Sequence, residues 1–167
     1  MPTGTIEKCV RELVARGMRI AFAESATAGR LASEFALVKD SGKILLGGIV
    51  CYDVGVKCDL LNIPKLFIEK YTPESAEVTK ALAENLRPHF KADIIVAVTG
   101  LASPGGSENA VKPVGTMFIH ILMPEAYIAH REVFDGSPEE IILQTIDTVC
   151  LLILDKLDSQ TPLRVTA

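Results

Sequence analysis

The sequence predicts an α/β protein, built as a three-layer α/β/α sandwich with a mixed, mostly parallel sheet. Short apolar runs rich in Ala, Val, Ile and Leu alternate along the chain with segments whose apolar residues recur at helical spacing. These runs have the composition of strands buried on both faces, which is typical of parallel strands between helices. Late in the chain, two apolar runs flank a tight turn, so a hairpin adds an antiparallel strand.

The first third of the chain predicts two helices and two strands. Apolar residues recur at helical spacing over 5–16, and Gly17 follows as a natural C-cap. Residues 18–24, MRIAFAE, predict the first strand, and a second helix is predicted over 26–38. After a turn signal, the long apolar run at 43–52 predicts the next strand.

The middle of the chain predicts helices ahead of its clearest buried strand. A proline separates two short helical pieces at 57–63 and 65–71. Residues 72–75, Thr-Pro-Glu-Ser, are typical of a helix start, and that helix is predicted to run to about Pro88. The run ADIIVAVTG at 92–100 predicts the buried strand.

The last third of the chain predicts the hairpin and a closing helix. The two strands of the hairpin are expected at 114–123 and 126–134. Ser137, followed by a proline and two glutamates, predicts the start of a final helix that ends near Leu157. The last ten residues are predicted to form a frayed tail.

Length and composition fit one globular domain. The 167 residues suffice for a buried core without a metal or disulfide staple, and no repeat, linker or boundary divides them. We therefore expect a single domain over residues 1–167, with its core at about 5–157. Although 49% of the residues are apolar, no run approaches the ~18 to 20 residues that a membrane span needs.

Charge and cysteine usage disfavour several classes of partner. The formal net charge is −4 and the pI is about 5.4, with acids and bases interspersed. Nucleic acid and anionic membranes are therefore not expected as partners. The N-terminal residues lack the basic and apolar blocks of a signal peptide, and the four cysteines form no CxxC pair or zinc-site spacing. We expect reduced thiols in a cytoplasmic protein.

Three of the predicted strands end in, or are directly followed by, residues that could take part in chemistry. They are Glu24–Ser25 at the end of the first strand, residues 51–53 (Cys-Tyr-Asp) at the end of the second, and Thr99–Gly100 at the end of the third. Ligands of open α/β sheets bind beyond the carboxyl ends of the strands. If these strands are parallel, the three sets of residues converge on one edge of the sheet.

Ser25 has two interpretations. As a helix N-cap, its hydroxyl would bond an early helix amide and contribute about 1 kcal/mol. As a nucleophile, it needs a base within hydrogen-bond reach and donors for an oxyanion. The first amides of the following helix can supply such donors, because they have no partner within the helix.

The base for such a nucleophile is sought among the histidines and lysines. The three histidines lie away from strand-to-helix corners and lack metal-site spacing, so we interpret them as structural or surface residues. Lys57 follows Tyr52 by five residues across a glycine turn, and a desolvated lysine loses its proton readily. A surface lysine beside a half-buried tyrosine is the alternative.

The loop TGLASPGGSENAVKPVG at 99–115 also has two interpretations. Its glycines permit a close approach of the backbone to an anion such as phosphate. It matches neither the GxxxxGK[ST] pattern nor a GxGxxG that opens a helix. A flexible surface loop is the competing interpretation.

Five motifs together resemble one known family. AESATAG, GGIVCYDVGVK, ESAEV, AVTGLASPGG and KPVGT occur in the order and rough spacing of the CinA C-terminal domain family. The resemblance covers roughly residues 5–157. Members of this family are nicotinamide mononucleotide (NMN) amidohydrolases. The molybdopterin-binding-like domain that precedes this domain in longer members is not matched, so the resemblance implies the stand-alone form.

The resemblance implies a serine amidohydrolase that converts NMN to nicotinate mononucleotide and ammonia in pyridine nucleotide salvage. Ser25 would be the nucleophile, Lys57 the base and Tyr52 a relay or orienting group, with no metal or organic cofactor. A small-molecule nucleotide is the implied partner, and self-association into a homo-oligomer is expected. The implied substrate-binding residues, with helix-start amides for the oxyanion among them, are Glu24, Thr27, Ala28, Gly29, Gly48, Thr99, Gly100, Gly105, Gly106 and Lys112.

The sequence departs from the family pattern at several positions. Ala26 stands where the family has cysteine, Ala28 where it has glycine and Val54 where it has asparagine. Pro138 lies in the segment where members often carry the arginine of F-x-G-D-R, and Lys112 is the candidate replacement for that cation. These departures favour two alternatives, which are amide hydrolysis of a related small molecule and a catalytically weak or silent binding or regulatory module.

Overall fold

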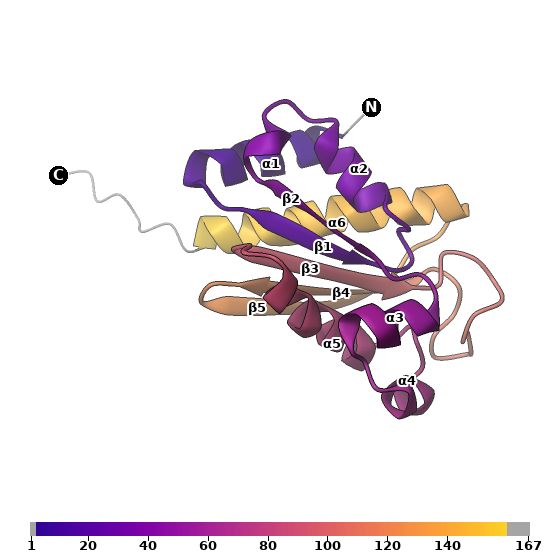
Figure 1. Ribbon diagram of the computed structural model, residues 1–167. Helices are drawn as coiled ribbons and strands as arrows, with labels where there is room; N and C mark the ends of the chain where they lie inside the picture. Colours follow the sequence, from indigo (N-terminus) through magenta and orange to yellow (C-terminus); the bar gives the residue numbers. More distant parts are fainter. Residues whose placement is uncertain (1–2, 160–167) are drawn as a thin grey trace.

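The computed structural model describes residues 3–159 and confirms the α/β class. Its centre is a five-stranded sheet between two layers of helices (Figure 1). The strands are β1 Ile20–Glu24, β2 Leu45–Val50, β3 Ile94–Gly100, β4 Thr116–Met123 and β5 Ala126–Val133. In space they follow the order β2-β1-β3-β4-β5. The β2, β1 and β3 strands are parallel to one another. In the hairpin, β4 is antiparallel to β3 and to β5, so β5 runs in the same direction as the first three strands.

Two groups of helices cover the two faces of the sheet (Figure 1). On one face lie α1 Gly4–Arg16, α2 Arg30–Ala36 and α6 Pro138–Ser159. On the other face lie α3 Val54–Leu61, α4 Lys65–Tyr71 and α5 Ala76–Leu86. Alternate residues of β1 enter the two cores, because successive side chains of a strand point to opposite faces. Every residue of β1 is therefore buried, which explains the unbroken apolar run that precedes Glu24 in this strand.

The α2 helix begins four residues later than the sequence predicted. Residues 25–29 form a turn in which Ala28 and Gly29 adopt φ angles of 48° and 92°. This left-handed backbone cannot continue into a helix, so the first helical residue is Arg30. The next strand is also shorter than predicted, because a single 3₁₀ turn at Ser41–Lys43 precedes it.

The α5 helix starts at Ala76 rather than in the Thr-Pro segment. Thr72 ends α4 with a φ angle of 70°, which separates the two helices. Ser75 is the N-cap, and its Oγ accepts a hydrogen bond of 3.2 Å from the amide of Val78. A serine cap satisfies one of the free amides of the first turn, which explains why the helix starts there.

The closing helix extends slightly beyond its predicted end. The sequence predicted an end near Leu157, whereas α6 continues to Ser159. The remaining part of the predicted tail, 160–167, lies outside the described residues. Between residues 3 and 159, no helix combines the length and the apolar composition that crossing a bilayer requires.

The register of the sheet brings three strand ends to one edge. Glu24 is paired with Val50 of β2 on one side and with Val98 of β3 on the other. The pairing continues past the strand, because the amide of Ser25 donates to the carbonyl of Val98 at 3.0 Å. The predicted convergence of the residues that follow these strands is therefore confirmed.

Candidate active site

A cavity of about 210 Å³ opens at the edge where β1, β2 and β3 end. Ser25 and Ala26 contribute from the turn after β1, and Tyr52 contributes from the segment after β2. Glu74, which lies just before α5, lines the cavity as well. The rest of the wall is the loop after β3, with the lining residues Gly100, Leu101, Ala102, Ser103, Pro104, Gly105 and Gly106.

Ser25 lies at the base of this cavity and does not cap α2. The N-cap position of that helix is Gly29, four residues further along the chain. The Ser25 hydroxyl instead lies 3.0 Å from Nζ of Lys57. The side chain is largely buried, yet it lines the cavity, so it is reachable only from that side. Of the two interpretations of this serine, the structure rejects the helix cap.

Lys57 is the buried partner of Ser25. It lies one turn into α3, whose N-cap Asp53 accepts a hydrogen bond of 2.7 Å from the amide of Gly55. Only 1% of Lys57 is exposed. Its Nζ donates to the carbonyl oxygens of Cys51 and Tyr52 at 2.6 and 3.1 Å. The alternative of a surface lysine is therefore wrong.

Burial shifts the acid–base equilibrium of Lys57 towards the neutral amine. Removal from water disfavours the ammonium form and lowers the pKa of Lys57 below its usual 10.5, while the nearby Cys51, Glu74, Asp53 and Cys58 act in the opposite direction. A neutral amine has two N–H donors and one lone pair. The two carbonyl oxygens match the donors, and the Ser25 hydroxyl lies where it can donate to the lone pair. This geometry is the one that a serine nucleophile and a neutral lysine base require.

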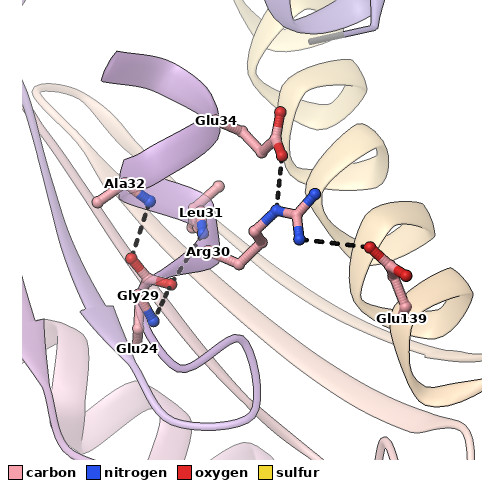
Figure 2. A network of polar contacts seen from close by, with 7 residues as sticks. All are labelled: Glu24, Gly29, Arg30, Leu31, Ala32, Glu34 and Glu139. Carbon is pink, nitrogen blue, oxygen red and sulfur yellow. Dashed lines mark hydrogen bonds and ion pairs between the residues drawn. The ribbon is translucent and has the colours of Figure 1, made fainter. Parts of the chain in front are cut away.

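Glu24 holds the turn that positions Ser25. Its carboxylate accepts hydrogen bonds from the amides of Gly29, Leu31 and Ala32 at 2.9 to 3.0 Å, as Figure 2 shows. Thr27 Oγ1 adds a fourth at 2.7 Å. An anion at this place also complements the positive end of the helix dipole. Glu24 was predicted to bind substrate, but its buried carboxylate points into α2 and does not line the cavity.

Arg30 connects the same turn to the closing helix. Its guanidinium contacts Glu34 at 2.6 Å within α2 and Glu139 at 3.4 Å at the start of α6 (Figure 2). Glu139 follows Pro138, the first residue of α6. The segment where the family pattern has an arginine thus supplies a carboxylate here, and that carboxylate contacts Arg30 rather than the cavity.

The amides predicted for the oxyanion are only partly available. The Ala28 amide donates to the Ser25 carbonyl at 3.1 Å, and the Gly29 amide is taken by Glu24. The amides of Ala26 and Thr27, in contrast, have no hydrogen-bond acceptor among residues 3–159. Ala26 also lines the cavity, so its amide is the better placed donor beside the nucleophile.

Tyr52 contributes its backbone more clearly than its hydroxyl. Its carbonyl holds Lys57 Nζ, whereas its side chain is 66% exposed. The hydroxyl has no hydrogen-bond partner within the described chain, although the side chain lines the cavity. The relay between Ser25 and Lys57 that was predicted for Tyr52 is not formed in this structure, because those two residues contact each other directly.

Three other predicted residues support the site from outside the cavity. Ala28 is exposed, and its positive φ explains a preference for glycine there without any approach to substrate. Gly48 lies within β2, where an added Cβ would fall 2.3 Å from the carbonyl oxygen of Phe22. Thr99 is buried at the end of β3, and its hydroxyl lies 2.8 Å from that of Thr79 on α5.

Lys112 also lies behind the cavity wall. Its Nζ donates to Thr72 Oγ1 and to the Glu74 carbonyl at 2.7 Å, and to Ser107 Oγ at 2.5 Å. Burial lowers the pKa of Lys112, Glu74 opposes that effect, and Arg131 adds to it. Lys112 lines a neighbouring cavity of about 320 Å³, which shares Glu74 with the first. This lysine therefore fastens the loop to the segment between α4 and α5.

The sequence did not assign Glu74 a role at the site. It is the first residue of the ESAEV motif, and its place near a predicted helix start explained it as an acid that is favourable beside the positive end of a helix dipole. The three glycines that were predicted in the loop, Gly100, Gly105 and Gly106, do line the cavity. Among the described residues, no three His, Cys, Asp or Glu side chains gather in a way that could hold a metal ion.

Sequence comparisons identify relatives of this chain. The family described as the CinA C-terminal domain matches residues 3–157. A CinA-like protein of Prochlorococcus marinus (strain AS9601) is 37% identical over 145 residues, which are 85% of this chain and 34% of that protein. A CinA-like protein of Desulfotalea psychrophila is 38% identical over 129 residues, which are 77% of this chain and 31% of that protein. The chain spans about a third of the length of these curated relatives.

Solved structures share the fold. The competence damage-inducible protein A (ComA) of Klebsiella pneumoniae superposes with a TM-score of 0.85 at 24% identity, covering 93% of this chain and 99% of that one. The competence/damage inducible protein CihA of Agrobacterium tumefaciens gives a TM-score of 0.84 at 26% identity, covering 93% and 97%. Together with the match over residues 3–157, this similarity shows that the chain belongs to the CinA family, through its C-terminal domain.

Proposed function

We propose that this protein is a serine amidohydrolase that converts NMN to nicotinate mononucleotide and ammonia. The observation that carries the proposal is the contact of 3.0 Å between Ser25 Oγ and Lys57 Nζ at the base of a cavity. A serine becomes a nucleophile when a base within hydrogen-bond reach can take its proton. The resemblance of the surrounding motifs to those of NMN amidohydrolases supports NMN as the substrate.

The first half of the reaction forms an acyl-enzyme. Ser25 Oγ attacks the carboxamide carbon while its proton passes to neutral Lys57. The negative charge that develops on the carboxamide oxygen is stabilised by the Ala26 amide, which has no acceptor within residues 3–159. Lys57, now an ammonium group, returns the proton to the leaving nitrogen. The carbon–nitrogen bond breaks, ammonia leaves, and an ester to Ser25 remains.

The second half releases the acid. A water molecule takes the place of ammonia, and neutral Lys57 accepts its proton as the water oxygen attacks the ester carbon. The proton then returns to Ser25 Oγ as the carbon–oxygen bond breaks. Cys51 and Tyr52 keep Lys57 Nζ in place throughout, because their carbonyl oxygens accept hydrogen bonds in both protonation states of the amine.

Ammonia release from NMN tests this proposal. We expect the purified protein to release ammonia and the Ser25→Ala variant to lose at least about 100-fold in rate. Ser33→Ala is the matched control, because this serine is exposed on α2 and away from the cavity. Equal rates from the wild type and Ser25→Ala would contradict the proposed nucleophile.

A binding module without catalysis is the second candidate function. The observation that favours it is the absence of any lysine or arginine among the described residues that line the Ser25 cavity, so the phosphate of NMN finds no cation there. The unengaged Tyr52 hydroxyl favours it as well. Measurable NMN binding without ammonia release would support this second candidate.

A further inference from the structure

Glu74 is the one charged side chain among the described residues that line the Ser25 cavity. The other lining residues are uncharged, and Lys57 lies buried beneath Ser25 rather than in the wall. A single carboxylate in a small cavity acts on any ligand that carries charge near it, because the surrounding protein screens charge less than water does. The negative charge of Glu74 therefore favours ligands that carry positive charge near it and disfavours ligands that carry negative charge there.

The Glu74 carboxylate is held in place by one hydrogen bond, and it can accept more. Its Oε2 accepts a hydrogen bond of 2.5 Å from Ser107 Oγ. Its Oε1 has no donor within residues 3–159. A carboxylate offers about four acceptor sites, so most of its capacity is open. The loop passes close to Oε1, since a Cβ added at Gly106 would lie 3.7 Å from that oxygen, although the contact that disfavours a side chain at this position is with Leu101 Cδ2 at 2.5 Å.

The nearby cations do not occupy the open oxygen. Lys112 donates all three of its protons elsewhere, to Thr72 Oγ1, Ser107 Oγ and the Glu74 carbonyl oxygen. Arg131 lines the neighbouring cavity and donates to the carbonyl of Val111. Both cations therefore fix the loop and the segment before α5, and neither donates a hydrogen bond to the Glu74 carboxylate.

We propose that Glu74 selects carboxamides carried on a positively charged ring, such as the pyridinium of NMN, over uncharged analogues. This inference rests on the proposed function and names the substrate class of the same site. A cavity of about 210 Å³ is smaller than typical ligand pockets, so it would hold the ring and its carboxamide rather than a whole nucleotide. The ring nitrogen would then lie near Glu74. The same carboxylate repels the acid group that hydrolysis creates, which favours product release.

A matched pair of ligands tests the proposal. NMN and its reduced form differ in the ring, which is a cation in NMN and an uncharged dihydropyridine in the reduced form. Their dissociation constants are measured by calorimetry on the Ser25→Ala variant, which prevents turnover. We expect NMN to bind about two- to fivefold more tightly than the reduced form, the range of a partly exposed ion pair. Adding Glu74→Gln should remove this preference.

Two further variants separate charge from structure. Ser107→Ala removes the hydrogen bond to Glu74 but keeps its charge, so the preference should remain. Glu77→Gln removes an exposed acid that lines only the neighbouring cavity, and it should also keep the preference. A thermal melt of each variant confirms that it is folded.

Three results would overturn the selection by Glu74. They are equal affinity of the Ser25→Ala variant for the two ligands, a preference that survives Glu74→Gln, and no binding of either ligand. Failure of the proposed function looks different, because it is seen as absent or Ser25-independent ammonia release by the protein with an intact site. The binding experiment remains informative in that case, since a silent module can also select a cationic ring.

Discussion

Two glutamates flank the proposed nucleophile, and the chain uses them in opposite ways. Glu24 is 2% exposed and accepts four hydrogen bonds from its own turn and helix. Glu74 lines the cavity and accepts one hydrogen bond from Ser107, and its second carboxylate oxygen has no donor within residues 3–159. A carboxylate whose oxygens accept hydrogen bonds from its own chain stabilises the structure of the site. A carboxylate that has an oxygen without a donor can still accept a hydrogen bond from a ligand or pair with its charge.

Stability should separate the two glutamates most strongly. Glu24→Ala leaves buried amides and the Thr27 hydroxyl without an acceptor, so we expect a loss of about 2 to 4 kcal/mol in the free energy of unfolding. Glu74→Ala removes one partly buried hydrogen bond, and a loss below about 1 kcal/mol is expected. Urea denaturation of both variants measures the difference. Equal losses of unfolding free energy in the two variants would contradict the different structural roles of Glu24 and Glu74.

The pH dependence of the rate should respond to Glu74. Lys57 acts as a base only when neutral, so the rate rises as pH increases through the pKa of Lys57. Burial lowers this pKa from 10.5, and the charge of Glu74 partly opposes that effect, as do Cys51, Asp53 and Cys58.

Glu74→Gln should therefore move the rise in rate to lower pH. Ammonia release measured across pH in the wild type and the variant tests the shift, with Glu77→Gln as the control, because Glu77 lies outside the Ser25 cavity. A rise that moves to higher pH would show that Glu74 does not act on Lys57 through its charge.

Ala28 offers the smallest and most local test of the turn that Glu24 holds. Its φ of 48° is unfavourable for any residue with a Cβ and free for glycine. We expect Ala28→Gly to raise the free energy of unfolding by about 0.5 to 1 kcal/mol without changing activity, because the residue is exposed and away from the cavity. A destabilised variant in urea would mean that the turn is held differently.

The core of the site was predictable from the sequence. The strands before Ser25 and Thr99 carry continuous apolar runs, which predicted buried parallel strands, and both strands are buried and parallel. The apolar run before Tyr52 predicted the same, and its strand is parallel, but β2 lies at the edge of the sheet and its residues are half-buried or exposed.

The sequence predicted a turn at Gly55 and a helical piece over 57–63, whereas α3 begins at Val54, so Gly55 is helical and Lys57 lies at the end of the first turn. The contact between Ser25 and Lys57 was expected from the resemblance to the family, because the spacing alone favoured a surface lysine.

The directions of the two glutamates were not predictable in the same way. The sequence does not show whether the side chain of a glutamate before Ser25 points into the cavity or towards the next helix. The choice depends on the left-handed backbone of Ala28 and Gly29, which lets the chain fold back and present its amides to Glu24. Glu74 likewise looks like a helix-start charge until the loop after β3 is placed against it.

The most direct test of the account is ammonia release from NMN by a Lys57→Met variant. Methionine preserves the unbranched, buried shape but cannot accept a proton, and removal of a general base costs roughly 10² to 10⁴ in rate. We expect a loss in this range with the fold retained, because Lys57 is the group in contact with Ser25 Oγ. A Lys57→Met variant that keeps more than about a tenth of the wild-type rate would contradict Lys57 as the base of Ser25.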